Sequence, residues 1–549
     1  MKKLFFGVFI ICCLFSFPKF VEAVSACPEK VTVEQPNGEK FKAYQRGDEG
    51  LNYVITEEGK VVSRGKDGFW YYNQMKVSKD NKSHSTISTN KVGIDRSPPT
   101  ATKEELFMQT AKRNELTLDN KKQQAFNTQT LQPKEHNILV LLVEFEDVKL
   151  TYSSQDWQTL VFGDNEGTLK DYYLKNTKGR VKVKPANESS ESFNDGIIRV
   201  KLDGKHPNTQ GQISYKNQKM TRQALEKADK YINYKEYDVN RNGRIEADEI
   251  HFMVIVAGKE ESAANVMGEP SVWGHRWALN SYEVNLDNTM LDYYTQFGEK
   301  HGSIQATLGI IAHEFGHDLG LSDLYNVGMT DENGKKTKIG SGVGYTSVMG
   351  SGSWGAKNGE SPGKTPTGLD AYSKVFLGMD VQTITESSSK TIQTIDEGEP
   401  TILRINSNKK NEFFLLENRQ MIGYDLGMQR GKAINSGGIA VYLINKQYDK
   451  NYTTGKQLVT VLEADEGIRG ESYYGIGGNF GADPFYYKGI GIHNKSQQTK
   501  LSRDTSPSTK LSDQSKENFS ILINSEPNTK MNINILHGDD HGNTKEEAS

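Results

Sequence analysis

This sequence has few cysteines, a small net charge and few long apolar runs. It has 3 Cys in 549 residues, and two of them, Cys12 and Cys13, lie near the N-terminus. Lys and Arg number 67 against 70 Asp and Glu, a net charge of −3, which argues against nucleic acid or an anionic membrane as a charge-driven partner. Hydrophobic residues make up only 35%, but 52 Gly and 25 Tyr indicate a loop-rich globular protein rather than a disordered one.

The first residues have the pattern of a secretion signal. Lys2 and Lys3 precede an apolar run over residues 4–17, and Val21, Glu22 and Ala23 form an acceptable cleavage site. The run is too short to span a bilayer. We therefore expect residues 1–23 to be removed and the protein to be secreted, extracellular and monomeric, with no stable membrane insertion.

Removal of that signal would leave Cys27 as the single cysteine of the mature chain. No intramolecular disulfide could then form, so a large core or bound ions must stabilise the protein outside the cell. The Cys27 thiolate is either a cap on a metal in a precursor or a bystander, and the bystander is the commoner case.

The most informative motif is H-E-x-x-H, formed by His313, Glu314 and His317. Two histidines four residues apart lie on one face of an α-helix, where both imidazoles can bind one zinc ion. The glutamate between them can reach a water molecule on that zinc. Apolar residues recur at helical spacing from residue 304 to 319, Gly302-Ser303 offers an N-cap, and Gly320 is a residue type that ends helices.

A third zinc ligand is expected where the helix ends. A chain that turns at Gly320 can bring Asp323 back to the metal, which would complete a His-His-Asp set with one open coordination position. Asp318 is a competitor, although its position directly after His317 directs it about 100° away around the helix. Glu332, in a turn-rich stretch, is the alternative if a more distant glutamate is used.

A second metal motif lies in residues 238–249, which match a twelve-residue calcium loop. Gly243 supplies the sharp turn, and a β-strand rather than a second helix is expected to follow. We therefore interpret the loop as a structural Ca²⁺ site. The predicted ligands are Asp238, Asn240, Asn242, Arg244 (through its carbonyl) and Glu249.

The chain divides into four mature segments by pattern. Residues 24–134 alternate short strands, such as 40–44 and 52–56, with glycine turns. Within this segment, residues 83–102 read as a Ser/Thr/Pro linker, Thr102 and Glu105 as a capping box for a helix to Leu116, and Lys121-Lys122 as the start of an exposed cleavage zone. Residues 135–385 follow as an α/β domain, with buried strands at 138–145 and 251–257 and a helix at 214–231.

Residues 386–537 show strand patterns separated by Gly, Asn and Asp turns, which predict a β-sandwich. Residues 538–549 read as a disordered tail. The expected strands of the sandwich are 401–405, 412–417, 438–444, 458–463, 519–523 and one through Met531, Ile533 and Ile535.

These motifs resemble the immune inhibitor A family of secreted bacterial metallopeptidases. The zinc motif through Asp323 matches that family's pattern, and residues 347–354 are similar to its Met-turn, with Met349 beneath the metal. Shorter matches, including residues 273–277 and 416–419, extend the likeness over most of residues 30–490. The resemblance implies a zymogen, with residues 24–134 as a propeptide covering the cleft of a metzincin-like catalytic domain.

The sequence therefore predicts a zinc endopeptidase that acts on proteins or peptides and carries Zn²⁺ and Ca²⁺. Glu314 would be the general base for the attacking water, and Tyr345 or Tyr372 could donate to the oxyanion. The alternative is a non-catalytic surface-binding protein in which the metals only brace the fold. The intact Glu314 argues against this alternative, because a purely structural zinc usually has four protein ligands.

Overall fold

The computed structural model describes residues 24–48, 50–78, 82–111, 133–266, 268–328, 342–431, 436–452, 455–464, 485–488 and 499–538. No helix in these ranges is long and apolar enough to cross a membrane. Outside them lie the expected signal, residues 121–132 of the predicted cleavage zone, Glu332 and residues 539–549 of the predicted tail.

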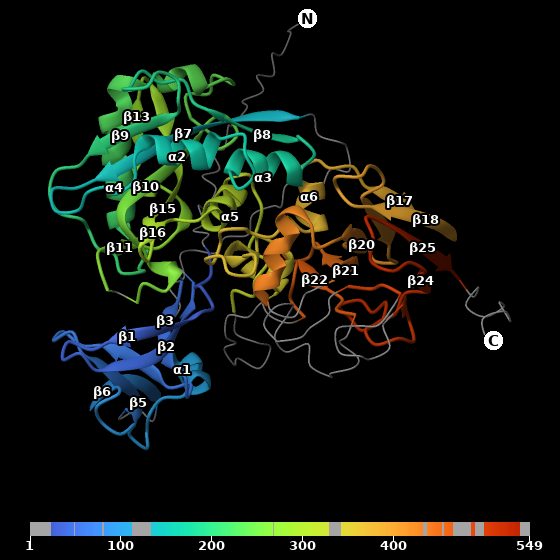
Figure 1. Ribbon diagram of the computed structural model, residues 1–549, viewed down its shortest axis with the longest axis horizontal. Helices are drawn as coiled ribbons and strands as arrows, with labels where there is room; N and C mark the ends of the chain where they lie inside the picture. The colour runs from blue at the N-terminus through green and yellow to red at the C-terminus, as the bar shows by residue number, and fades with distance from the viewer. Residues whose placement is uncertain are drawn as a thin grey trace, which may run out of the picture.

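The N-terminal segment forms an antiparallel sheet of six strands in sequential order, drawn in blue at the lower left of Figure 1. The first part of the stretch predicted to be a linker, residues 83–91, is in fact the last strand of this sheet, β6, and the prediction is wrong there. Its Ser and Thr residues suit an edge strand that is largely exposed, because they keep β-propensity without needing a core. The strands are β1 (Lys30–Glu34), β2 (Lys40–Gly47), β3 (Asn52–Thr56), β4 (Val61–Arg64), β5 (Trp70–Val77) and β6 (Ser83–Lys91).

Helix α1 (Glu104–Thr110) follows this sheet and is shorter than predicted. Its N-cap is Lys103, without a side-chain cap, so the predicted capping box is absent. Thr102 is instead taken up by the sheet: its carbonyl accepts the Val61 N–H at 2.9 Å, and its hydroxyl lies 3.2 Å from Ser85 Oγ.

The middle of the chain is built on a mixed sheet in the order β12-β15-β10-β7-β8, with β9 also paired to β7, β11 to β10 and β16 to β15. The two continuous apolar runs form buried strands, as predicted, and these strands, β7 and β10, pair in parallel. The strands are β7 (Lys134–Glu144), β8 (Val181–Pro185), β9 (Ile197–Lys201), β10 (His251–Glu260), β11 (Ser271–Val272), β12 (His275–Ala278), β15 (Tyr293–His301) and β16 (Ile304–Gln305).

Both faces of this sheet are covered, because alternate residues of β7 belong to two different cores. Ile138 and Val140 pack with α2, α3 and α5, while Leu139 and Leu141 pack with α4. A small hairpin of β13 (Val284–Leu286) and β14 (Thr289–Leu291) joins the second side. The helices are α2 (Ser154–Phe162), α3 (Leu169–Asn176), α4 (Tyr215–Ala228), α5 (Leu308–Asp318) and α6 (Ala371–Phe376), with 3-10 turns η2 (Tyr234–Tyr237), η5 (Gly344–Thr346), η6 (Ser351–Trp354) and η7 (Gly423–Gly431).

The C-terminal part contains a five-stranded and a four-stranded sheet, ordered β17-β19-β20-β21-β22 and β18-β25-β24-β23. The two sheets share a core: the rings of Phe414 and Phe519 lie 5.0 Å apart, and Met531, Ile533 and Ile535 are fully buried. The strands are β17 (Gln382–Ile384), β18 (Ser388–Gln393), β19 (Ile402–Asn406), β20 (Glu412–Arg419), β21 (Gly438–Asn445), β22 (Val459–Val461), β23 (Lys500–Ser502), β24 (Phe519–Ile523) and β25 (Lys530–His537).

The same core continues from these sheets to α5, so the chain shows no break in packing at residue 385. Polar contacts add to this. Arg419, at the end of β20, donates to the carbonyl of Thr346 in η5 and is 1% exposed. Lys374 in α6 bonds to Glu417 in β20 at 2.6 Å. The C-terminal sheets therefore hold in place the segment from η5 to α6, which packs against α5 (Figure 1).

Candidate metal centre

Helix α5 carries the H-E-x-x-H motif and begins later than predicted. Gly302 and Ser303 do not cap it; they turn the chain between β15 and β16, where His301 pairs with Ile304 and Gly302 adopts φ +61°. The N-cap is Thr307. The predicted end is correct, since Gly320 adopts φ +94°, a conformation that favours glycine.

The two histidines and Asp323 converge on one point. The structure places one nitrogen of each ring and one Asp323 oxygen within 4.8 Å of one another, and all three residues are buried. Asp323 Oδ1 lies 3.3 Å from His313 Nε2 and 3.2 Å from His317 Nε2. The turn at Gly320 thus brings Asp323 back to the helix.

Hydrogen bonds on the far side of each ring show that the site fits a cation. His313 Nδ1 lies 2.8 Å from the carbonyl of Val348, and His317 Nδ1 lies 2.9 Å from that of Leu321. A carbonyl only accepts, so in each neutral ring Nδ1 carries the proton and Nε2 a lone pair. The two Nε2 atoms are 3.0 Å apart with no proton to share, beside a carboxylate oxygen. Two imidazole nitrogens and one carboxylate are a zinc donor set.

The electrostatics favour a neutral His313 and a charged Asp323. Burial lowers the pKa of His313, which keeps the ring neutral, although Asp323 opposes this. Burial alone would raise the pKa of Asp323, but His317 and His313 hold it below its ordinary value, so the carboxylate is charged. Neutral imidazoles and a carboxylate are the forms that bind metal.

Glu314 is fully buried and faces the N-terminal segment of the chain. Its Oε1 accepts the backbone N–H of Val24 at 2.9 Å. Val24 is also fully buried, and the next residues bond to the walls around it: Trp273 Nε1 donates to the carbonyl of Val24 at 3.0 Å, and Trp354 Nε1 to that of Ser25 at 2.9 Å. Residues 24–27 therefore lie in the space next to Glu314.

The segment predicted to be a Met-turn packs under α5. A Cβ on Gly316 would lie 2.7 Å from Met349 Sδ, and one on Gly309 would lie 1.8 Å from the carbonyl of Ser353. Only glycine allows this approach, so the two glycines, two helical turns apart, let α5 lie directly on residues 349–353. Met349 is fully buried, and its carbonyl accepts the N–H of Leu324 at 2.8 Å, next to Asp323.

Asp318, the competing ligand, turns away from the three donors. Its Oδ2 lies 2.6 Å from His251 Nδ1 and its Oδ1 3.3 Å from Arg276 Nε, while His251 Nε2 lies 3.0 Å from His136 Nδ1. Burial raises its pKa, but His251 and Arg276 together hold the pKa below its ordinary value. This chain of polar groups anchors the end of α5 to the sheet. Sequence reasoning missed it because His136 and His251 carry no local motif.

The two candidate oxyanion donors are both buried. Tyr345 lies in η5 and is 5% exposed; Tyr372 lies in α6 and is 7% exposed. Burial raises the pKa of each hydroxyl, so both stay protonated. Tyr325 is a further aromatic neighbour of the site, since its ring stacks on His313 at 6.4 Å between centroids.

Cys27 does not belong to the group of metal donors found among the described residues. It is 3% exposed, and burial raises the pKa of its thiol to about 12. A buried neutral thiol is unreactive. The structure thus favours the bystander interpretation.

The predicted calcium loop lies between η2 and β10. Both oxygens of Asp238 point into the loop, where they accept the N–H groups of Asn242 and Gly243 at 2.9 Å. Glu249 closes the loop, since its Oε1 accepts the N–H of Asn240 at 3.1 Å. Oxygens at the first, third, fifth and last positions therefore face inward, as Ca²⁺ requires; Arg244, at the seventh position, forms an isolated bridge with Met290.

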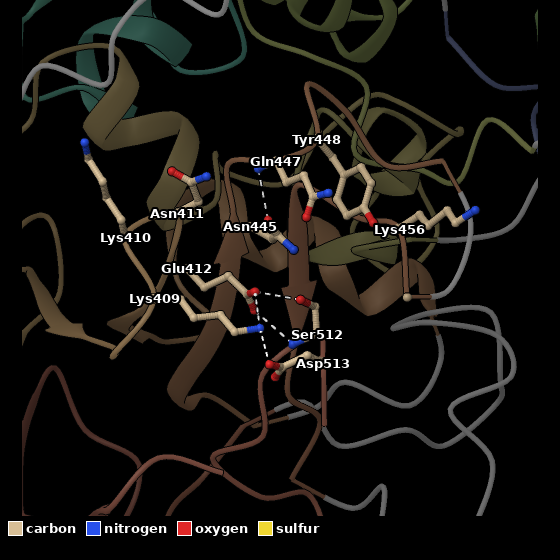
Figure 2. Close-up of a pocket in the computed structure, with 11 residues that line it drawn as sticks. Lys409, Lys410, Asn411, Glu412, Asn445, Gln447, Tyr448, Lys456, Ser512 and Asp513 are labelled. Carbon is tan, nitrogen blue, oxygen red and sulfur yellow. Dashed lines mark hydrogen bonds and ion pairs between the residues drawn. The ribbon is translucent and has the colours of Figure 1, made fainter. Parts of the chain in front are cut away.

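A separate hollow of about 450 Å³ lies in the C-terminal sheets, shown in Figure 2. Its walls are polar: Lys409 pairs with Asp513 at 2.6 Å, and Glu412 accepts from Ser512 at 2.6 Å. Among the described residues, no histidine lines this hollow.

Comparison with known proteins agrees with the motif. Residues 124–382 match the family model described as immune inhibitor A peptidase M6, catalytic domain. Residues 124–382 therefore match the peptidase domain of the immune inhibitor A family. The resemblance expected from the sequence is confirmed, and the matched residues include the three candidate metal donors and the predicted calcium loop.

Two curated relatives extend this comparison. The pre-pro-metalloprotease PrtV of Vibrio cholerae serotype O1 is 27% identical over 391 residues, which is 58% of this chain. Immune inhibitor A of Bacillus thuringiensis subsp. alesti is 26% identical over 295 residues, or 47% of the chain. Each match spans 41% of the relative's length. A solved structure, catalytically inactive OgpA from Akkermansia muciniphila with an O-glycopeptide, matches 59% of this chain and 87% of its own at 14% identity and a TM-score of 0.24.

Proposed function

We propose that this protein is a secreted zinc-dependent endopeptidase, made as a zymogen, that hydrolyses extracellular proteins. The observation that carries the proposal is the convergence of two imidazole nitrogens and one carboxylate oxygen beside Glu314. His313, His317 and Asp323 would hold the ion. A bound zinc would polarise the scissile carbonyl and acidify a water molecule.

Glu314 would act as the general base and then as the proton donor. Its carboxylate takes a proton from the attacking water and passes it to the leaving nitrogen. The contact with Val24 supports this role, because Glu314 Oε1 lies 2.9 Å from a peptide nitrogen placed in the cleft. The carbonyls of Val348 and Leu321 fix the orientation of the two histidine rings, so these rings need little reorganisation during the reaction. Tyr345 and Tyr372 stay candidates for the oxyanion donor.

The zymogen part of the proposal rests on residues 24–27. They fill the space next to Glu314 and bond to both Trp273 and Trp354, so a substrate cannot enter until they leave. Removal of the signal after Ala23 would turn the Val24 nitrogen into an ammonium group facing the Glu314 carboxylate. That ion pair would strengthen the block until residues 24–134 are detached.

Casein hydrolysis tests the proposal. Once residues 24–134 are detached, the metal-loaded protein should degrade casein, and a zinc chelator should abolish the reaction. Glu314→Gln should keep the metal and lose activity by several orders of magnitude, since it removes the base but no ligand. Casein turnover by Glu314→Gln at the wild-type rate would overturn the assigned role.

The surface-binding alternative would place function in the polar hollow near Lys409 (Figure 2). That alternative does not explain why Glu314 is buried and lies beside three candidate metal donors. A protein of that kind would leave casein intact with zinc present.

A further inference from the structure

The segment over residues 24–27 is held almost wholly through its main chain. Trp273 Nε1 donates to the carbonyl of Val24 at 3.0 Å, and Trp354 Nε1 to that of Ser25 at 2.9 Å. On the same segment, the N–H of Cys27 donates to the carbonyl of Ser262 at 2.8 Å. Main-chain contacts do not depend on side-chain identity, so the same groups can bind the backbone of other extended peptides.

The two indoles are built to receive carbonyl oxygens. Trp273 is fully buried and Trp354 is 1% exposed, and an indole N–H can only donate. A buried donor without an acceptor is costly, so departure of residues 24–27 leaves two donors that need new carbonyls. A peptide substrate supplies carbonyls on consecutive residues, as Val24 and Ser25 do.

The contact with Glu314 sets the register. In hydrolysis the base delivers its proton to the leaving nitrogen, so the nitrogen beside Glu314 Oε1 stands for the leaving nitrogen. Val24 then occupies the place of the first residue after the scissile bond, and Ser25 that of the second. Residues 24–27 lie as the leaving half of a cut substrate would lie.

We infer that Trp273 and Trp354 bind the carbonyls of the first and second substrate residues after the scissile bond. This inference deepens the proposed function and depends on it. It also names a substrate class: Val24 is fully buried in the apolar core that includes Ile310 and Leu308, so the first residue must be aliphatic. A charged side chain there would be buried without a partner.

Kinetics of the mature enzyme test the two donors. Trp273→Phe and Trp354→Phe each keep an aromatic ring and remove one N–H, so KM for peptide substrates should rise about tenfold while kcat changes less. Trp157→Phe is the matched control, because Trp157 is also fully buried and its Nε1 has no hydrogen-bond partner in the described part of the chain. Equal KM for all three variants would overturn the inference.

Hydrogen exchange in the full chain gives a readout that needs no activity. The amides of Ala26 and Cys27 should exchange faster in the Trp273→Phe, Trp354→Phe double variant than in wild type or Trp157→Phe, with or without zinc. Unchanged exchange would show that the indoles do not hold the segment, whether or not the protein proves to be a peptidase. If the protein cleaves no substrate, the proposed function is wrong. The exchange rates still show whether the two indoles bind residues 24–27.

The cut sites of the wild-type protein test the register without any variant. New amino termini in a digested protein mixture should start with Val, Ile or Leu several times more often than those residues occur in the mixture. Termini without that enrichment would overturn the assignment of Val24 to the first position.

Discussion

The backbone nitrogen of Val24 lies 2.9 Å from Oε1 of Glu314, although the two residues are 290 positions apart. Glu314 lies between two metal donors on α5, and Val24 is among the first residues of the N-terminal segment. The contact joins the predicted catalytic base to the predicted propeptide. We therefore attribute the inactivity of the proposed zymogen to the N-terminal end of that segment rather than to Cys27.

Val24→Asp should release the block in the uncleaved chain. The substitution places a carboxylate in an apolar site and next to Glu314, where like charges repel. Casein hydrolysis by the intact chain, checked by gel for the absence of processing, should rise at least tenfold, an effect of about 1.4 kcal/mol on occupancy of the cleft. Lys30→Asp, on exposed β1, is the control and should leave the rate unchanged. Equal rates for both variants would show that residue 24 does not block the cleft.

Calcium should stabilise the protein through the loop that contains Asp238 and Glu249. With a dissociation constant on the order of 10⁻⁴ M and about 1 mM calcium, the gain is about 1.4 kcal/mol. The melting midpoint should fall when a chelator that spares zinc is added, and Glu249→Gln should melt at the lower temperature in both conditions. A melting midpoint that does not change with calcium would contradict the predicted calcium site.

Arg419 should be essential for stability because it joins the C-terminal sheets to the segment under α5. It is 1% exposed and bonds to Asp425, Glu417 and the carbonyl of Thr346. Arg419→Met would leave buried carboxylates without their partner and should lower the free energy of unfolding by about 3–5 kcal/mol in urea titration.

The control for that experiment is Arg503→Met, at a half-exposed ion pair with Asp504, which should change stability by less than about 0.5 kcal/mol. Comparable losses in the two variants would contradict the bracing role of Arg419.

His301 should make the protein lose stability in acid. Burial lowers its pKa from 6.5 to about 3, so between these values the unfolded chain binds a proton that the folded chain does not. Stability from this group is present above pH 6.5 and falls by about 1.4 kcal/mol for each pH unit below it. His301→Phe keeps ring packing on Trp354, 5.6 Å away, and should lose about 2 kcal/mol less than wild type between pH 7 and pH 5.

If His301→Phe and wild type lose stability in parallel from pH 7 to pH 5, His301 is not buried in its neutral form.

Local patterns predicted the parts of the structure that local residues determine. The spacing of His313 and His317, the turn at Gly320 and the apolar run of β7 each act within a few residues, and each gave a correct element. The start of α5 was mispredicted because Gly302 and Ser303 suit a hairpin turn as well as a cap, and only pairing between β15 and β16 decides between them.

Contacts between distant residues could not be predicted from the sequence. Trp273 and Trp354 are ordinary aromatic residues until residues 24–27 are placed against them. The same holds for His251 with Asp318, since neither residue marks the other along the chain. The predicted linker failed for a related reason: Ser and Thr are compatible with both a loop and an edge strand, and β5 supplies the partner that selects the strand.

Elemental analysis of the purified protein tests the central claim most directly. We expect one zinc ion per chain in wild type and in Glu314→Gln, and a large loss of zinc in His313→Ala, His317→Ala and Asp323→Ala. Wild-type protein without tightly bound zinc, or zinc retained fully by all three ligand variants, would contradict it.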